Sequence, residues 1–262
     1  MCTEIIDGKR AVTGRTLSVA QAISAPPEES MLARLNRYFD TAVADTPDLL
    51  RQAYELRYRV YCLEMTGFED PNEHPDGLEK DAYDVSSVHG LLIHRASRQA
   101  TGTVRIVLPR REAPEHSFAI QSVTDHPALK DPSEFPPTTA EVSRFCISRQ
   151  FRRRQSDTLY DQKENDSTGE GRSGPLMRLG LIQILLQMSA QHGVTHWCAV
   201  MEPTLLRMLS GMAIRFKPIG PPVEYHGLRQ FCICSISEIL QAVKRERPVF
   251  WEVLTCGGVL RF

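Results

Sequence analysis

The sequence predicts an α/β domain in which helices cover the faces of a mixed β-sheet. Three observations predict this class: apolar residues at helical spacing before residue 61, short strand-like runs between 88 and 148, and alternating helix and strand patterns from 175 onward. No internal repeat is evident. We expect residues 29–262 to form a single domain. Residues 1–28 have little apolar periodicity, and we expect them to form a mobile N-terminal arm.

The first part of the domain is predicted to be helical. Apolar residues recur every three to four positions from Met31 to Phe39. The pattern returns after Thr46 and Pro47, which can cap and begin a helix, and it continues to about Tyr61. Two helices are therefore expected before the first strand.

The middle of the chain contains three predicted strands, at Val88–Ala96, Gly102–Leu108 and 140–148. A turn separates the first two, which favours an antiparallel pair. The loop at 67–77 is rich in Pro, Gly, Asp and Asn, which favour turns. After the second strand the chain is rich in proline, and only Phe118–Val123 is expected to form a short helical turn.

The last part of the chain alternates between helices and strands. Residues 155–174 are acidic and polar without an apolar pattern, which predicts a flexible insertion. The elements expected after it are a helix from Pro175 to about His192, a strand at 194–200, a helix at 203–212, strands at 216–219 and 231–236, and a helix at 237–245.

Composition indicates a cytoplasmic protein. The formal net charge of the 262 residues is -1, so no global attraction to nucleic acid is expected. Seven cysteines without a disulfide-scaffold spacing indicate a reduced protein. The longest apolar stretch, Leu179–Met188, is interrupted by glutamines and is too short to span a bilayer.

Charged residues in four segments are the main functional signal. They lie at helix and strand positions where a charge is costly to bury alone, at Arg57, Asp81, Asp84, Arg105, Glu141 and Arg144. One interpretation is a structural network of ion pairs. The other is a polar pocket for an amine-bearing or zwitterionic substrate. Strand alternation predicts that Glu141, Ser143 and Phe145 share one face and that Arg144 points to the other.

In their order and residue pattern, these segments resemble the acyl-homoserine-lactone synthases and the N-acyl amino acid synthases. They resemble most the acyltransferases associated with PEP-CTERM and exosortase systems. The similar pieces are the Arg57–Tyr61 stretch, Asp-Ala-Tyr-Asp at 81–84, Arg105, Phe118 and Glu-Val-Ser-Arg-Phe at 141–145. The order of predicted elements likewise resembles the acyl-CoA N-acyltransferase fold, called GNAT-like.

The resemblance implies transfer of a fatty acyl group from a thioester to the amine of an amino acid or related small molecule. The donor would be acyl carrier protein (ACP) or, less often, coenzyme A, with no tightly bound cofactor and no metal. Glu141 is the candidate base, and backbone N–H groups of its strand would stabilise the oxyanion. Ser143 and Arg144 join it as catalytic candidates. The implied substrate-binding residues are Arg57, Asp81, Asp84, Arg105, Phe118 and Phe145.

Several alternatives stay open. The enzyme could be a lactone synthase, although the tryptophan typical of that family is replaced here by the region around Phe68. It could be a coenzyme A dependent acetyltransferase, or a non-catalytic module that binds acyl amides. Cys146 with His89 or His94 could form a thiol nucleophile. The pairs at Cys232/Cys234 and His196/Cys198 lack a second pair at zinc spacing, so core cysteines are favoured over a metal site.

Two further expectations concern the donor. Arginines directly after the 140–148 strand form a basic patch that either is a solvated surface or docks the acidic helix of ACP, at Arg149, Arg152, Arg153 and Arg154. An apolar acyl tunnel is expected between the sheet and the 175–192 helix, with Leu176, Leu179, Ile182, Leu186 and the Met201–Met212 segment as walls.

Overall fold

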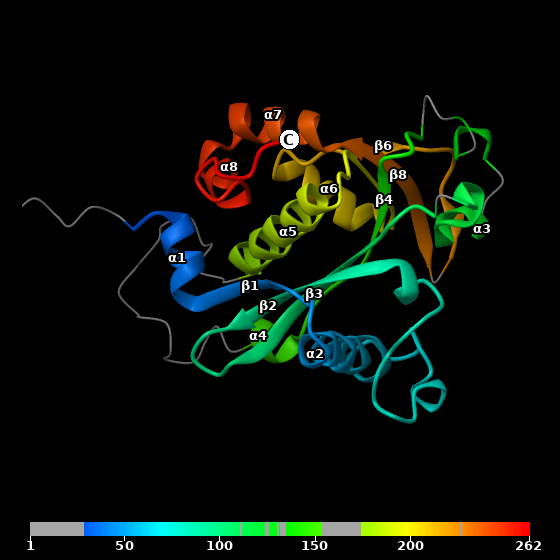
Figure 1. The fold of residues 1–262 in the computed structure, drawn as a ribbon, viewed down its shortest axis with the longest axis horizontal. Helices are drawn as coiled ribbons and strands as arrows, with labels where there is room; N and C mark the ends of the chain where they lie inside the picture. Colours follow the sequence, from blue (N-terminus) through cyan, green and yellow to red (C-terminus); the bar gives the residue numbers. More distant parts are fainter. Residues whose placement is uncertain are drawn as a thin grey trace, which may run out of the picture.

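A computed structural model of the chain describes residues 29–110, 112–123, 126–129, 131, 135–153, 174–225 and 227–262. It confirms the predicted class, because a mixed sheet lies between helices on both faces (Figure 1). The predicted arm at 1–28 lies outside the described residues, as does the predicted insertion at 155–174 except for Gly174.

The sheet of the described residues has eight strands, of which only β4 and β5 pair in parallel. Their order is β1-β2-β3-β4-β5-β8-β6, and β7 pairs with β8. The strands are β1 Phe39–Val43, β2 Ser87–His94, β3 Gln99–Val107, β4 Thr139–Ile147, β5 His196–Met201, β6 Lys217–Pro218, β7 Val223–Glu224 and β8 Leu228–Ser235.

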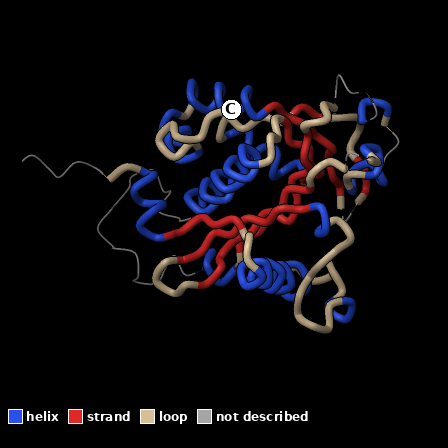
Figure 2. The backbone as a smooth tube through the Cα atoms, viewed as in Figure 1, coloured by secondary structure: helices blue, strands red, loops and turns tan. Residues whose placement is uncertain are grey.

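The helices form a layer on each side of the sheet, with α2 below β1–β3 and α5 above them in the view of Figure 2. The terminal helices pack with α5, so that α8 contacts α1, α5 and α7. The helices are α1 Met31–Tyr38, α2 Pro47–Arg57, α3 Ala119–Val123, α4 Arg149–Arg153, α5 Gly174–Gln191, α6 Pro203–Gly211, α7 Ile236–Glu246 and α8 Pro248–Leu254. Within the described residues, no helix is long and apolar enough to cross a membrane.

Helix α5 lies very close to the sheet because the contact between them contains glycines on both sides. A Cβ atom at Gly90 of β2 would come within 2.8 Å of the Ile184 side chain. A Cβ atom at Gly180 of α5 would likewise come within 2.8 Å of Leu92. The contact therefore requires glycine at both positions, and it places the apolar surface of α5 directly on β2 and β3.

The first helix is shorter than the sequence predicts, because residues from Phe39 form strand β1 instead. This strand pairs antiparallel with β2, and Phe39 is buried in the core. Asp40 forms ion pairs with Arg95 and Arg98 across the strand pair. Helical spacing of the apolar residues was thus a poor guide here, since pairing with β2 overrides local preference.

The second helix changes its winding near the charged cluster. Thr46 accepts a hydrogen bond from the backbone N–H of Leu49 and caps α2 at its N-terminus. The α-helix ends at Arg57, and the chain continues as a π-helix over Tyr58–Glu64 instead of ending near Tyr61. π-Helical turns are uncommon and often occur at functional sites.

Candidate active site

A β-bulge in β4 sets the orientation of the motif residues. Thr103 pairs with Cys146 and Arg105 pairs with Ser143, so Val104 alone lies opposite both Arg144 and Phe145. Arg144 takes a left-handed conformation with φ 53°, which costs a residue other than glycine about 1–2 kcal/mol. The extra residue reverses the alternation from this point onward.

The predicted faces of β4 are therefore wrong at two positions. Arg144 points to the same side of the sheet as Ser143, where both side chains contact charged partners. Phe145 packs instead with the core that surrounds α5. The bulge adds one residue between the two, which simple alternation does not anticipate.

Arg57 is the most deeply buried member of a network of charged side chains, with no exposed surface. Its Nε and Nη2 atoms donate to Glu79 at 2.6 and 3.0 Å, and its Nη1 and Nη2 atoms donate to Asp84 at 2.7 and 3.1 Å. Burial alone would lower the pKa of Arg57, but the two carboxylates raise it. Arg57 therefore stays charged and ties helix α2 to the 79–84 loop.

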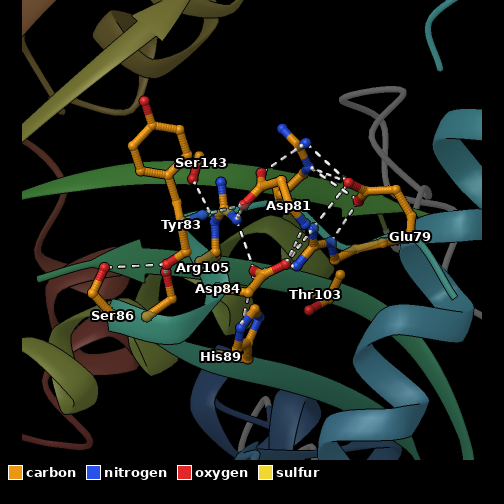
Figure 3. Close-up of polar contacts among 12 residues, drawn as sticks. Glu79, Asp81, Tyr83, Asp84, Ser86, His89, Thr103, Arg105 and Ser143 are labelled. Carbon is orange, nitrogen blue, oxygen red and sulfur yellow. Dashed lines mark hydrogen bonds and ion pairs between the residues drawn. The ribbon is translucent and has the colours of Figure 1, made fainter. Parts of the chain in front are cut away.

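Arg105 of β3 holds the other end of this loop (Figure 3). Its Nη1 atom donates to Asp81 at 2.6 Å and to Asp84 at 2.7 Å. Its Nε atom donates to the hydroxyl of Ser143 on β4 at 3.0 Å. The predicted residues Asp81, Asp84, Arg105 and Ser143 are thus brought together on one face of the sheet.

Arg144 completes the network from β4. Its guanidinium donates to Glu79 at 2.9–3.2 Å and to Asp81 at 3.0 Å, and it lies 3.5 Å from Glu69. It also stacks over the ring of Tyr61, 5.5 Å from the ring centroid. These partners hold Arg144 in its strained backbone conformation, and strain of this kind is typical of functional sites.

Glu79 belongs to the network although the sequence analysis did not select it. Its side chain is 1% exposed and accepts hydrogen bonds from both Arg57 and Arg144. Burial opposes its ionisation, but the two guanidinium groups lower its pKa to about 2. Charge balance could have revealed it, because three buried arginines need more than the two aspartates of the motif.

Glu141 lies on the same face but makes no ion pair among the described residues. Its carboxylate accepts a hydrogen bond from the backbone N–H of Ile120 at 3.1 Å, and its side chain is almost fully buried. Burial raises the pKa of Glu141, while the Ile120 bond and the charges of Arg105 and Arg144 partly offset this effect. A carboxyl group with a raised pKa is a better proton acceptor near neutral pH.

Phe118 lies near Glu141 in a second apolar cluster. It is buried, and its ring is 5.8 Å from that of Phe135. Ile120, which donates to Glu141, is a member of the same cluster. The segment around α3 therefore forms the apolar surroundings of the Glu141 carboxyl group, and Phe118 is part of its packing.

Strands β4 and β5 pair over only three positions and share a cavity at their far ends. Their ladder ends at Glu141 opposite Cys198, although β4 continues to Ile147 and β5 to Met201. A cavity of about 540 Å³ lies beyond the ends of these strands. It is lined by the end of the π-helix, the 65–68 loop, the start of α4, the residue after β5 and one residue of β8: Glu64, Met65, Thr66, Gly67, Phe68, Arg149, Glu202 and Arg229. Glu141 thus lies at the point where β4 and β5 separate, which we call the fork. The ends of both strands beyond the fork border one cavity.

The basic patch is described only in part. Arg149 is exposed and lines the cavity, whereas Arg152 and Arg153 are placed only as backbone in α4. Arg154 lies outside the described residues. The carboxylate of Glu64 accepts from the Arg149 backbone N–H at 2.7 Å and from the Ser148 hydroxyl at 2.8 Å, so it occupies the N-terminus of α4.

The cysteines and histidines show no second reactive centre within the described residues. Burial raises the pKa of Cys146 to about 12, which disfavours a thiolate nucleophile. No group of three or more His, Cys, Asp or Glu in the described chain could hold a metal ion. His89 is buried beneath the network, with its Nε2 atom 3.4 Å from Asp84, and burial lowers its pKa to about 4.

The expected tunnel walls lie in the main core. Leu176, Leu179, Ile182 and Leu186 of α5 are all buried among the apolar residues of this core. The cavity at the ends of β4 and β5 does not include them among its lining residues. An acyl tunnel along α5 stays a prediction.

Comparisons with known proteins agree with this geometry. A sequence model of the acetyltransferase (GNAT) domain matches residues 56–161, which contain the whole network. BjaI, a CoA-dependent acyl-homoserine lactone synthase solved with SAM and isopentyl-CoA, is 19% identical, with 84% of this chain and 88% of that chain covered and a TM-score of 0.53. The chain matches no curated protein sequence.

Two other solved structures have the same fold. TofI, solved in a ternary complex with an inhibitor and MTA, is 20% identical, with 80% of this chain and 99% of that chain covered and a TM-score of 0.54. FeeM, an N-acyl amino acid synthase from uncultured soil microbes, is 15% identical, with 78% and 93% covered and a TM-score of 0.52. The GNAT domain match identifies the chain as an acyltransferase, in a fold similar to that of these synthases.

Proposed function

We propose that this chain is an N-acyltransferase that moves a long-chain acyl group from the thioester of acyl carrier protein to the amine of an amino acid or a related small molecule. The observation that carries the proposal is the fork between β4 and β5. Glu141 is the last residue of β4 that pairs with β5, and the ends of the two strands border one cavity of about 540 Å³. A thioester arm that enters from the cavity between the strands would bring its carbonyl towards Glu141.

The reaction needs a base, and Glu141 fits this role. The neutral amine attacks the thioester carbonyl, the C–S bond breaks, the thiol is released, and the amine loses a proton. Glu141 takes this proton directly or through a water molecule, since burial raises its pKa. Backbone N–H groups of β4 that do not pair with β5 would stabilise the oxyanion.

The network favours a cationic amine as the incoming acceptor. Three guanidinium groups, on Arg57, Arg105 and Arg144, are in contact with four carboxylates, on Glu69, Glu79, Asp81 and Asp84. The carboxylates exceed the cations by one charge. Asp81 and Glu69 are about one quarter exposed, so this excess faces the side from which a ligand can approach.

The N-terminus of α4 supports a carrier protein as donor. A helix N-terminus can bind the phosphates of coenzyme A, but here Glu64 already accepts from the first backbone N–H of α4. Arg149 lies exposed at the cavity rim, where it can attract the acidic helix of ACP. BjaI is named as CoA-dependent, so both donors belong in the test.

Mass spectrometry of lipid extracts from cells that express the wild type or Glu141→Gln tests the proposal. The wild type should produce a new acyl amide, and Glu141→Gln should reduce it about 10²–10⁴-fold while the protein stays folded. Glu55→Gln, an exposed carboxylate of α2, is the matched control. Full activity in Glu141→Gln would remove Glu141 from the role of base.

Purified enzyme distinguishes the donors. Rates with acyl-ACP, acyl-CoA and acyl-pantetheine should favour acyl-ACP. Arg149→Glu should then raise KM for acyl-ACP and leave KM for acyl-pantetheine unchanged. Equal rates with acyl-CoA and acyl-ACP, or an equal effect of Arg149→Glu on both small and carrier-bound donors, would contradict docking at this patch.

A further inference from the structure

We propose that Tyr61 is a positioning residue for acyl transfer, which holds Arg144 in place and connects it to the wall of the cavity at the ends of β4 and β5. The connection to the cavity rests on the proposed entry of the donor there. Tyr61 is 7% exposed and does not line the cavity, so it acts on the reactants only through its neighbours.

The ring of Tyr61 contacts both a cation and another ring. The guanidinium carbon of Arg144 lies 5.5 Å from the centroid of the Tyr61 ring. The centroid of the Phe68 ring lies 5.2 Å from the same point. A cation–π contact is stronger where water is excluded, as it is around this buried ring. Phe68 lines the cavity, so a single aromatic side chain connects the cavity wall to the charged network.

The polar atoms of Tyr61 add two contacts to the same region. Its hydroxyl interacts with the thiol of Cys146, which lies two residues after Arg144 on β4. Its backbone carbonyl accepts a hydrogen bond from the N–H of Glu69 at 3.3 Å, and the Glu69 carboxylate lies 3.5 Å from Arg144. Tyr61 therefore contacts β4 at the bulge and directly after it, and it also holds the loop residue that faces Arg144.

Two irregular backbone segments meet at this contact. Tyr61 lies in the π-helix Tyr58–Glu64, in which hydrogen bonds span five residues instead of four. Arg144 lies in the β-bulge with φ 53°, which is unfavourable for a residue other than glycine. Such a conformation persists only where its surroundings hold it. The π-helix brings Tyr61 to the place where the strained residue needs this support.

The position of Arg144 matters for the candidate base. Its charge lowers the pKa of Glu141 and so opposes the effect of burial. If Arg144 moves away, the pKa of Glu141 rises, and the acid limb of the pH profile of kcat moves to higher pH. The titratable and charged groups that act on Glu141 are Arg105 of β3, Arg144 of β4, Asp81 of the 79–84 loop, Cys198 of β5 and Tyr225 of the turn between β7 and β8.

Steady-state kinetics of Tyr61 variants test the proposal, with acyl-ACP as donor and a mixture of the twenty standard amino acids as acceptors. Tyr61→Leu should lower kcat about tenfold or more and move the acid limb to higher pH. Tyr61→Phe keeps the ring and should restore both kcat and the pH profile. Tyr38→Leu is the matched control, because Tyr38 of α1 also lies beneath an arginine, Arg37, at 5.4 Å. It should leave both quantities unchanged.

A double-mutant cycle tests whether Tyr61 acts through Arg144. Arg144→Gln removes the cation that contacts the ring and should itself lower kcat. In this background Tyr61→Leu should lower kcat by less than about twofold, since the contact is already lost. If Tyr61→Leu lowers kcat by the same factor in both backgrounds, Tyr61 does not act through Arg144 and the proposal is wrong.

A measurement without turnover uses protein labelled with 15N-arginine. The Nε–H signal of Arg144, assigned separately in each protein, should shift when decanoyl-pantetheine is added to the wild type. Tyr61→Phe should keep this response, and Tyr61→Leu should lose it, because the contact between the cavity wall and Arg144 is then broken. The measurement needs no Arg144 variant and no acceptor.

Each outcome decides a different statement. Wild-type kcat and pH profile in folded Tyr61→Leu overturn the positioning role, and an Arg144 signal that ignores the probe overturns the link to the cavity. If the wild type forms no acyl amide, the proposed function fails, and the NMR response decides the inference by itself. A shift that requires the ring of Tyr61 then supports it, and an identical shift in Tyr61→Leu overturns it.

Discussion

The two faces of the sheet differ in the kind of side chain that they bury. The face under α5 is a continuous apolar core in which Leu181 and Ile184 are fully buried. The opposite face has apolar clusters under α2 and under α3, and the charged network lies between them. Replacing a buried ion network with well-packed apolar residues is often neutral or stabilising. The charged face is therefore explained better by the demands of a binding site than by stability.

The largest expected effect comes from breaking the charged face. Arg57→Ala leaves Glu79 buried with one arginine fewer, and it should lower the free energy of unfolding by about 3–5 kcal/mol, measured by urea denaturation. Arg51→Ala removes an exposed arginine of the same helix that pairs with Glu55, and it should change the free energy by about 0.5 kcal/mol or less. Similar losses in both variants would contradict the contrast between network and surface.

A truncation on the apolar face should lower the stability of the protein without lowering its catalytic rate. Leu181→Ala removes a fully buried side chain of α5 and should cost about 2–5 kcal/mol. The rate per folded molecule should stay at the wild-type value, because Leu181 faces away from the network. A fall in kcat at a temperature where the variant is fully folded would mean that the two faces are coupled.

The pH dependence of stability should arise on the charged face. The folded pKa of His89 is lowered from 6.5 to about 4, so the unfolded chain binds a proton first and stability falls as the pH drops through this window. Glu79 adds a second loss between about pH 4.5 and 2. His89→Gln should remove most of the first loss, about 1–3 kcal/mol, in urea titrations at pH 7 and 4.5. An unaltered profile in His89→Gln would exclude His89 as its source.

Much of the fold and of the site follows from local sequence patterns. Five of the six charges that the sequence grouped meet in one network, at Arg57, Asp81, Asp84, Arg105 and Arg144, because each charge needs partners once it is buried. The sixth, Glu141, accepts a backbone hydrogen bond and has no ion pair among the described residues. Helix α5 was recognisable from its length and its apolar run between Pro175 and Gly193.

What the sequence did not reveal depends on tertiary contacts. Strand β1 forms because β2 offers a free edge to Phe39–Val43, which no local pattern records. Glu79 lies in an ordinary polar stretch, and only its distance from Arg57 and Arg144 makes it important. The bulge at Arg144 breaks an alternation that the sequence itself suggests.

This bulge makes the site depend on residue number as well as on residue type. The guanidinium of Arg144 reaches the carboxylates because one surplus residue turns its side chain around, whereas Phe145 enters the core for the same reason. Deletion of one residue within 142–145 would keep almost every side chain of the motif. It would nevertheless move the side chains at the end of β4 to the opposite face of the sheet. In a comparison with related chains, the number of residues in this part of β4 therefore matters as much as their identity. An alignment that gains or loses one position here would place equivalent residues on opposite faces of the sheet.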